Sequence, residues 1–214
     1  MNTATDHQLI AVARLNFAYG NFPVFVDFEW ASDQQVSVIR GPSGCGKTTL
    51  LKLLLGVLRP SERTQVSAPS PRRMILQDDS LCPWLSGWDN LEIFTGKSRE
   101  AIRAHSLFAL VSGFVDRPAY QLSFGQRRLV ELLRIFLPGE GLLLLDEPLN
   151  YLDKGRRALV LKFLNNDLGS AMRVVLTTHL TDELTLKNAD QFEFAGDPPH
   201  SRLLVNAIDH DARA

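Results

Sequence analysis

Residues 41–48 have the types and spacing needed to hold a phosphate group. They read GPSGCGKT, which matches the pattern G-x-x-x-x-G-K-[ST] at every fixed position. Glycines let successive backbone N–H groups point inward around an anion, and a helix that starts here adds the positive end of its dipole. The segment predicts a phosphate-binding loop that contacts a nucleotide through Gly41, Ser43, Gly44, Cys45, Gly46, Lys47, Thr48 and Thr49.

Three side chains of this loop are expected to have different chemical roles. Lys47 can reach the β- and γ-phosphates, and the hydroxyl of Thr48 can ligate magnesium. Cys45 is interpreted as a spacer, with a redox role as the alternative. The loop by itself fits kinases, GTPases and many ATPases. A chance match is disfavoured because a strand pattern precedes the loop and a helix pattern follows it.

An acidic pair stands at the end of the apolar run GLLLLDEP. Such a run is typical of a strand buried on both faces of a parallel sheet, so Asp146 is expected at the carboxyl end, where ligands bind. Asp146 can hold a metal directly or through water, and Glu147 can accept a proton from an attacking water. A structural acidic pair is the alternative, but burying it without a cation costs several kcal/mol.

Alternating strands and helices are expected to position these groups. A turn-rich polar stretch covers residues 59–71, and a broken helical segment covers residues 78–120, with breaks at Pro83, Gly87, Gly96 and Gly113. A helix is expected to start near Ser123 as its N-cap. Strands are expected at 9–15, 23–31, 35–40, 72–77, 141–146 and 172–178, edge strands at 191–196 and 202–207, and helices at 49–58, 125–137, 151–166 and 180–188.

Length and composition describe an ordinary globular chain. The 214 residues are 45% hydrophobic and 22% charged, which suits one domain with a sizeable core. A net charge of -1 gives no sign of general binding to nucleic acid or anionic lipid. Cys45 and Cys82 indicate free thiols rather than a disulfide framework. Without a signal peptide or an apolar run of about 18 residues, we expect a soluble, cytoplasmic protein.

The order of the motifs resembles that in the ATPase subunits of ABC transporters. LSFGQ, at Leu122 to Gln126, resembles the family's signature, and LLLLDEP resembles its acidic Walker B element. The resemblance covers residues 9–204 and implies an α/β fold: a P-loop NTPase (RecA-like) core with a parallel sheet, a small antiparallel β-subdomain and a compact α-helical subdomain. It implies a single domain, 1–214, with its core at about 1–77 and 121–214 and the helical subdomain at about 78–120.

The resemblance also implies a catalytic set. Gln77 matches the family's glutamine loop and would sense magnesium and the attacking water, beside Thr48 and Asp146 as metal ligands. His179 would hydrogen-bond the γ-phosphate and keep Glu147 aligned with that water, while Lys47 stabilises charge. The cofactors implied are ATP and Mg²⁺.

A further group of residues is implied to contact nucleotide outside the phosphate loop. Ser123, Gly125 and Gln126 of the signature would contact ATP bound to the opposite subunit, and Asp153 lies in the loop that crosses the dimer interface. An aromatic side chain is expected to stack on adenine. Tyr19 is preferred for this role, with Phe17 and Phe22 as alternatives and a plain core position as the structural explanation.

Three features depart from the family pattern. Phe124 stands at a signature position usually filled by glycine, so its bulky side chain must point away from nucleotide. Glu131 and several leucines occupy the following helix where relatives usually carry alanine, so the packing of this helix should differ. The segment between Lys47 and Gln77 is short, which predicts a trimmed β-subdomain. None of these changes removes a catalytic group.

The resemblance implies an ATPase subunit of a membrane transporter, peripheral on the inner face of the membrane. Its partners would be a membrane-spanning subunit and a second ATPase subunit, expected as a homodimer, with no nucleic acid. An ABC ATPase that drives a non-transport complex, of cell-division or lipid-handling type, is the alternative. The Pro83–Trp84 pair resembles nitrate, sulfonate and taurine importers, but we interpret it as a hydrophobic anchor of the helical subdomain.

Overall fold

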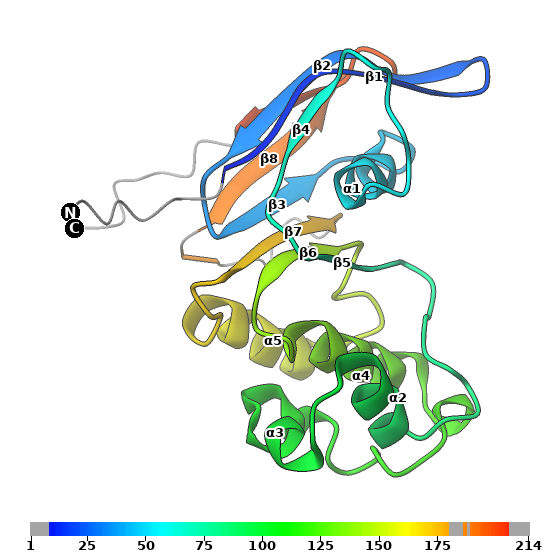
Figure 1. The fold of residues 1–214 in the computed structure, drawn as a ribbon, viewed down its shortest axis with the longest axis vertical. Coiled ribbons are helices and arrows are strands. Elements are labelled where there is room, and N and C mark those ends of the chain that lie inside the picture. The colour runs from blue at the N-terminus through cyan, green and yellow to red at the C-terminus, as the bar shows by residue number, and fades with distance from the viewer. Residues whose placement is uncertain (1–8, 180–185, 188, 206–214) are drawn as a thin grey trace, which may run out of the picture.

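The chain folds around two sheets with helices on either side of the larger one (Figure 1). The computed structural model describes residues 9–179, 186–187 and 189–205. The larger sheet has all of its neighbouring strands parallel except the pair at the β9 edge. Its strands in spatial order are β5 (Arg72–Ile75), β6 (Gly141–Leu145), β7 (Met172–Thr178), β3 (Val36–Arg40), β8 (Ala189–Ala195) and β9 (Arg202–Val205).

The smaller sheet is antiparallel and has the order β2-β1-β4. Its strands are β1 (Ile10–Tyr19), β2 (Phe22–Ser32) and β4 (Gln65–Ser67). Strand β4 lies in the turn-rich, polar stretch 59–71, for which no strand was expected. It could not be recognised because β4 is three residues long and mostly exposed, so it carries no alternating hydrophobic pattern.

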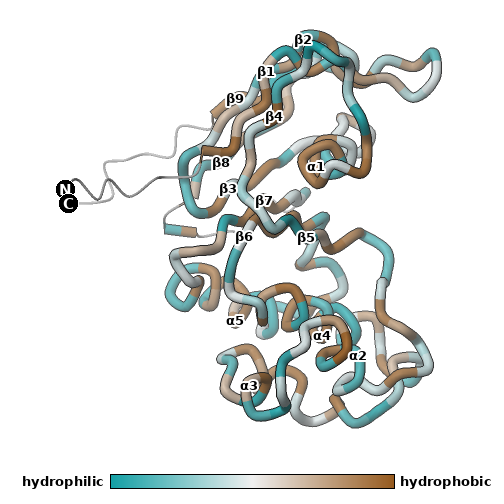
Figure 2. The backbone as a smooth tube through the Cα atoms, viewed as in Figure 1, coloured by the Kyte–Doolittle hydropathy of each residue, from teal (hydrophilic) through white to brown (hydrophobic). Residues whose placement is uncertain are grey.

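Helix α1 (Lys47–Leu55) and the small sheet cover one face of the central sheet, and the remaining helices gather on the other face (Figure 1). Figure 2 shows α1 as a mostly hydrophobic segment, as expected for a helix packed between two sheets. Among the described residues, no helix is both long and apolar enough to cross a membrane. The other helices are α2 (Gly87–Thr95), α3 (Arg99–Ala104), η1 (Ser106–Leu110), η2 (Ala119–Gln121), α4 (Phe124–Phe136) and α5 (Lys154–Asn166).

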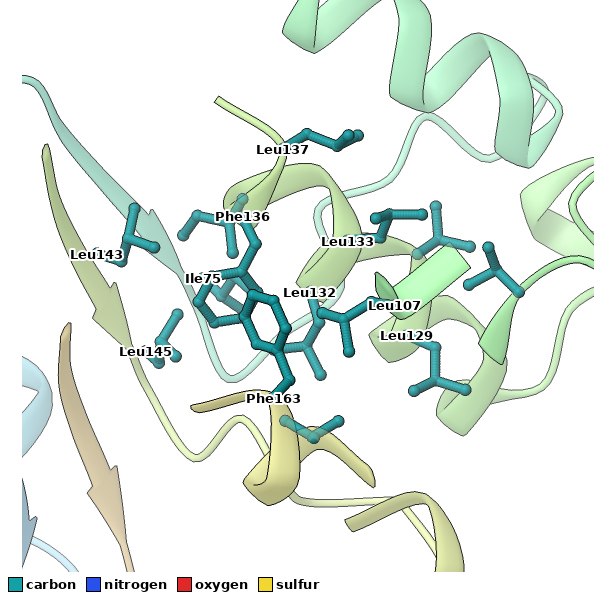
Figure 3. Close-up of a cluster of buried hydrophobic side chains, with 14 of the residues drawn as sticks. Ile75, Leu107, Leu129, Leu132, Leu133, Phe136, Leu137, Leu143, Leu145 and Phe163 are labelled. Atoms are coloured by element: carbon teal, nitrogen blue, oxygen red, sulfur yellow. The ribbon is translucent and has the colours of Figure 1, made fainter. Parts of the chain in front are cut away.

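The leucine run of β6 confirms the expectation of a strand buried on both faces. Leu143 and Leu145 point into a core shared with Phe136 of α4 and Phe163 of α5 (Figure 3). The alternate residues of β6 pack into a second core, shared with α1 and the small sheet. Since successive side chains of a strand point to opposite faces, a single apolar strand joins both cores. The acidic pair therefore follows a strand that is buried on both faces.

Several sequence expectations need correction. The segment 191–196 was expected at an edge, but β8 is interior, because β3 pairs with it on one side and β9 on the other. Gly87 does not break a helix; it is the first residue of α2, after the N-cap Ser86. Trp84 is 73% exposed and is therefore not a buried anchor. The helix expected at 180–188 and the end of the strand expected at 202–207 lie outside the described residues.

The architecture confirms the α/β fold class, with a parallel central sheet, a small antiparallel sheet and a group of helices. The helix expected near Ser123 begins at Phe124 with Ser123 as N-cap, as predicted. Helices of the segment 78–120 pack against α4, which follows them in the chain. The division into a core at 1–77 and 121–214 and a helical subdomain at 78–120 stays a prediction.

Candidate functional site: a nucleotide cleft

The site lies where four neighbouring parallel strands end. In the spatial order β5, β6, β7, β3, the chain segments that follow these strands carry Gln77, then Asp146 and Glu147, then His179, then the phosphate-binding loop. Parallel strands all present their carboxyl ends at one edge of the sheet, where ligands of open α/β folds bind. Residues far apart in the sequence therefore meet along one line.

Two glycines of the phosphate-binding loop have backbone conformations that other residues adopt only with strain. Gly41 has a φ of 151°, and a Cβ added there would lie 2.9 Å from the Sγ of Cys45 and 2.9 Å from the Cβ of Phe194. Gly46 has a φ of 108° and is the N-cap of α1. The loop can therefore curl tightly and turn its N–H groups toward an anion at the start of α1.

Lys47 is nearly buried beneath this loop. Its Nζ donates to the carbonyl oxygens of Gly41, at 2.7 Å, and Pro42, at 2.9 Å. Carbonyl oxygens carry no formal charge, so these two hydrogen bonds do not neutralise the ammonium group, which can attract a phosphate in the adjacent cleft.

Asp146 is 1% exposed and is held through both carboxylate oxygens. Its Oδ2 accepts a hydrogen bond of 2.6 Å from the hydroxyl of Thr48, and its Oδ1 accepts one of 2.7 Å from the hydroxyl of Thr177. Oxygen donors are the ligands that Mg²⁺ prefers, typically one or two from protein side chains together with phosphate oxygens and water. The hydroxyl and carboxylate that meet here fit that requirement.

Three polar contacts hold Glu147 in place beside Asp146. Its Oε2 lies 2.5 Å from Nδ1 of His179 and accepts a hydrogen bond of 2.9 Å from Nδ2 of Asn150. Its backbone N–H donates to the hydroxyl of Thr177, at 3.0 Å. Its φ of 50° lies in the left-handed region, which costs about 1–3 kcal/mol for a residue other than glycine. These contacts hold the carboxylate toward the cleft despite that strain.

A cleft of about 320 Å³ runs along this edge of the sheet. The hydroxyl of Tyr19 lies 3.4 Å from the Oγ1 of Thr49, which places this ring on the cleft wall. Phe17 packs edge-on against Tyr19 and does not line the cleft, and Phe22 is exposed. The lining residues are Tyr19, Val24, Ser43, Gly44, Gly46, Lys47, Thr48, Thr49, Gln77, Asp146 and Glu147.

Cys45 is enclosed within the loop. It is a free thiol, buried behind the phosphate-binding backbone with its Sγ 3.9 Å from Nζ of Lys47. Burial raises the pKa of the thiol, and the neighbouring Lys47 ammonium offsets this only in part. A neutral, buried thiol is a poor nucleophile, so the environment favours the spacer interpretation over a redox role.

The signature residues lie outside the cleft of their own chain, at the N-terminus of α4. The Ser123 hydroxyl accepts from the backbone N–H of Gln126, and the Gln126 side chain accepts from the backbone N–H of Ser123, which forms a capping box. Gly125 leaves no room for a side chain, because an added Cβ would lie 2.6 Å from the carbonyl oxygen of Tyr151. This end of the helix is thus pressed against the segment before α5.

Two exposed aromatic rings cover the same helix end. Phe124 is 62% exposed, and its ring packs against that of Tyr151, with 5.5 Å between centroids. The guanidinium of Arg127 lies 4.5 Å from the centroid of the Phe124 ring. Nearby, Asp153 is the N-cap of α5 and accepts from the backbone N–H of Arg156 at 2.9 Å. Asp153 therefore has a structural role as the cap of α5, and it does not line the cleft.

Two residues of the site were not found from the sequence. Thr177 bonds both acidic residues, and Asn150 bonds Glu147. A signal for Thr177 was its hydroxyl near the end of an apolar strand, and a signal for Asn150 was its position three residues after Glu147. The signal for Thr177 could not be used without knowing that β6 and β7 are neighbours, whereas the contact of Asn150 is local to the segment after β6.

The fold and the cleft together define a P-loop ATPase of the ABC type. Its distinguishing combination is a phosphate loop, an acidic pair with a histidine, and a separate capped helix that carries LSFGQ. The chain belongs to the ABC transporter family, whose profile matches residues 26–150. It is an ATP-binding subunit of that family and an ATPase coupled to transport.

Relatives and a solved structure agree with this assignment. Taurine import ATP-binding protein TauB of Pseudomonas aeruginosa is 34% identical over 178 residues, which are 75% of this chain and 67% of that protein. The protein of the same name in Yersinia pestis biovar Antiqua is 37% identical over 175 residues, 74% of this chain and 68% of that protein. A solved chain of an ABC transporter of proposed metal-chelate type, in an inward-facing conformation, aligns with a TM-score of 0.69 and 25% identity, covering 87% of this chain and 79% of that one.

Proposed function

We propose that the chain hydrolyses Mg²⁺-ATP as one of two identical subunits that close head-to-tail around nucleotide. In this proposal each cleft is completed by the signature of the other subunit. The two subunits drive a separate membrane-spanning subunit from the inner face of the cell membrane. The direction we propose is import, and the support for it is the similarity to proteins named for taurine import.

Within one cleft, the contacts of each residue suggest the role that we propose for it. Lys47 and the loop N–H groups bind and neutralise the β- and γ-phosphates. Thr48 and Asp146, with Gln77, hold Mg²⁺, which screens phosphate charge when bound. Glu147 accepts the proton of the attacking water, and His179, whose ring lies against its carboxylate, keeps it aligned. Tyr19 stacks on adenine from the cleft wall.

The observation that carries the proposal is the separation of two half-sites within one chain. Lys47, Asp146, Glu147 and Gln77 line one cleft, while Ser123 and Gly125 at the N-terminus of α4 do not line it. A helix N-terminus with a serine cap and a glycine is suited to bind phosphate. Its best use is therefore on nucleotide held by a second copy of this chain.

Light scattering with Mg²⁺-ATP tests this proposal on the wild-type chain and the Glu147→Gln variant. We expect the variant to bind ATP, to hydrolyse it about 10²–10⁴-fold more slowly, and to accumulate as a dimer. The matched control is Glu140→Gln, because Glu140 is exposed and lies at the opposite end of β6. A variant that binds ATP and stays monomeric at all concentrations contradicts the homodimer.

The membrane partner is tested separately, by co-purification from membranes followed by solute flux in vesicles. We expect a multispanning protein to co-purify with the chain and uptake to stop with Glu147→Gln. A co-purified membrane complex without solute flux would instead support a non-transport function.

A further inference from the structure

A buried ion pair joins two residues of α4. The guanidinium Nη1 of Arg128 lies 3.0 Å from Oε2 of Glu131, and the two side chains are 3% and 1% exposed. Charges this deeply buried lose their hydration, and such pairs seldom add net stability over apolar residues of similar size. Stability alone is therefore a poor explanation for this pair, and its other contacts indicate what it does.

Both members of the pair are bonded to the segment that carries Gln77. Arg128 donates from Nη1 to the carbonyl oxygen of Leu76, at 2.9 Å, and from Nη2 to that of Gln77, at 2.6 Å. Oε1 of Glu131 accepts from the backbone N–H and from the hydroxyl of Ser80, each at 2.7 Å. The chain after β5 is thus fastened to α4 at both ends of a short loop.

Further contacts from the same helix strengthen this attachment. Arg127 forms an ion pair of 3.1 Å with Asp79, and Arg134 donates to the hydroxyl of Ser80 at 2.6 Å. Side chains of α4 thus contact this loop at Leu76, Gln77, Asp79 and Ser80. The same helix begins at Phe124, within the signature, with Ser123 as its N-cap. Helix α4 therefore contacts the loop that presents Gln77 to the cleft and also carries part of the signature.

We propose that Arg128, oriented by Glu131, is a positioning residue for Gln77. It holds the backbone of Gln77 at a fixed place relative to the signature helix. This inference rests on the proposed catalytic role of Gln77, and it adds two residues of α4 that hold Gln77 in place.

The test replaces the pair with apolar residues of similar volume, Arg128→Met with Glu131→Leu, in the full chain. This change removes the tether without leaving a buried unpaired charge, so the fold is expected to survive. We expect kcat for Mg²⁺-ATP hydrolysis to fall about 10–100-fold while KM changes less than about threefold, because displaced groups lose transition-state alignment first. The control removes the exposed pair Glu92–Arg99 of the same helical region, as Glu92→Gln with Arg99→Gln, and should leave kcat unchanged.

A double-mutant cycle shows whether the effect runs through Gln77. Gln77→Ala should lower kcat by itself, and the apolar pair should add little in that background, since the group it positions is gone. If the two effects multiply independently, or the apolar pair leaves kcat unchanged while Gln77→Ala lowers it, the positioning role is wrong. If Gln77→Ala has no effect, the proposed part of Gln77 fails and this inference fails with it.

A milder variant guards against loss of the fold. Glu131→Gln keeps an oxygen that can accept from Ser80 and removes only the charge that orients Arg128. We expect the same direction of change, a lower kcat with KM retained, and circular dichroism like that of the wild type. A fully active Glu131→Gln variant together with an active apolar pair overturns the proposal.

Discussion

The phosphate-binding cleft and the N-terminus of α4 are built in different ways. In the cleft, Asp146 is almost fully buried, and its hydrogen-bond partners come from helix α1 and strand β7. At the helix end, Ser123 and Gln126 satisfy each other locally, while Phe124 and Tyr151 remain 62% and 59% exposed. Rigid burial suits chemistry, which needs groups fixed in place, whereas a capped and exposed helix end suits contact with another surface.

The largest effect is expected when the positive charge under the phosphate loop is removed. Lys47→Ala should abolish ATP binding by the isolated chain and slow hydrolysis by at least about 10²–10³-fold, because Lys47 is the only lysine or arginine among the described residues that line the cleft. Binding of a fluorescent ATP analogue and phosphate release are the measurements. Lys52→Ala, on the outward part of the same helix, is the control. ATP binding by Lys47→Ala at wild-type affinity would remove this lysine from the site.

The second prediction concerns the connection between the two regions. Glu131→Ala leaves the guanidinium of Arg128 buried without its carboxylate, so the free energy of unfolding should fall by about 3–5 kcal/mol. The combined Arg128→Met and Glu131→Leu variant should lose less stability than Glu131→Ala, because it leaves no unpaired charge buried. Denaturant titration followed by circular dichroism gives both values. Equal losses in the two variants would show that the pair is needed for stability in its own right.

The third prediction sharpens the contrast at the helix end. Ser123→Ala and Ser98→Ala each remove one N-cap hydrogen bond, from α4 and α3, and each should cost about 1 kcal/mol of stability. Only Ser123→Ala should also slow hydrolysis, while the isolated chain binds ATP as before. Thermal unfolding, nucleotide titration and steady-state ATPase assays separate these effects. Weaker ATP binding by monomeric Ser123→Ala would mean that the signature contacts nucleotide in its own chain.

The smallest effect concerns the thiols. Burial raises the pKa of Cys45, so less thiolate is present at any given pH, and a maleimide should modify it at least about tenfold more slowly than the half-buried Cys82. Mass spectrometry of the Cys45→Ser and Cys82→Ser variants at neutral pH measures the two rates. The difference should narrow as the pH rises, because more of the Cys45 thiol then ionises. Faster labelling of Cys45 would contradict an enclosed, rigid loop.

The local motifs could be recognised from the sequence because each depends on neighbours along the chain. The phosphate loop needs Gly41, Gly46 and Lys47 at fixed spacing, and the cap of α4 needs Ser123 and Gln126 three residues apart. The leucine run of β6 showed that the strand is buried on both faces. The fold class followed from these patterns, and the catalytic and trans roles of the motif residues remain predictions to be tested by the variants above.

Contacts between distant segments were decided by the tertiary structure alone. Thr177 became the partner of Asp146 and Glu147 because β7 lies beside β6, and β8 became an interior strand because β9 covers its outer edge. The pair Arg128–Glu131 found its partners in the loop after β5 because α4 packs there. Strand order and helix placement arise from how the whole chain buries its apolar surface, and no short stretch of sequence records that arrangement.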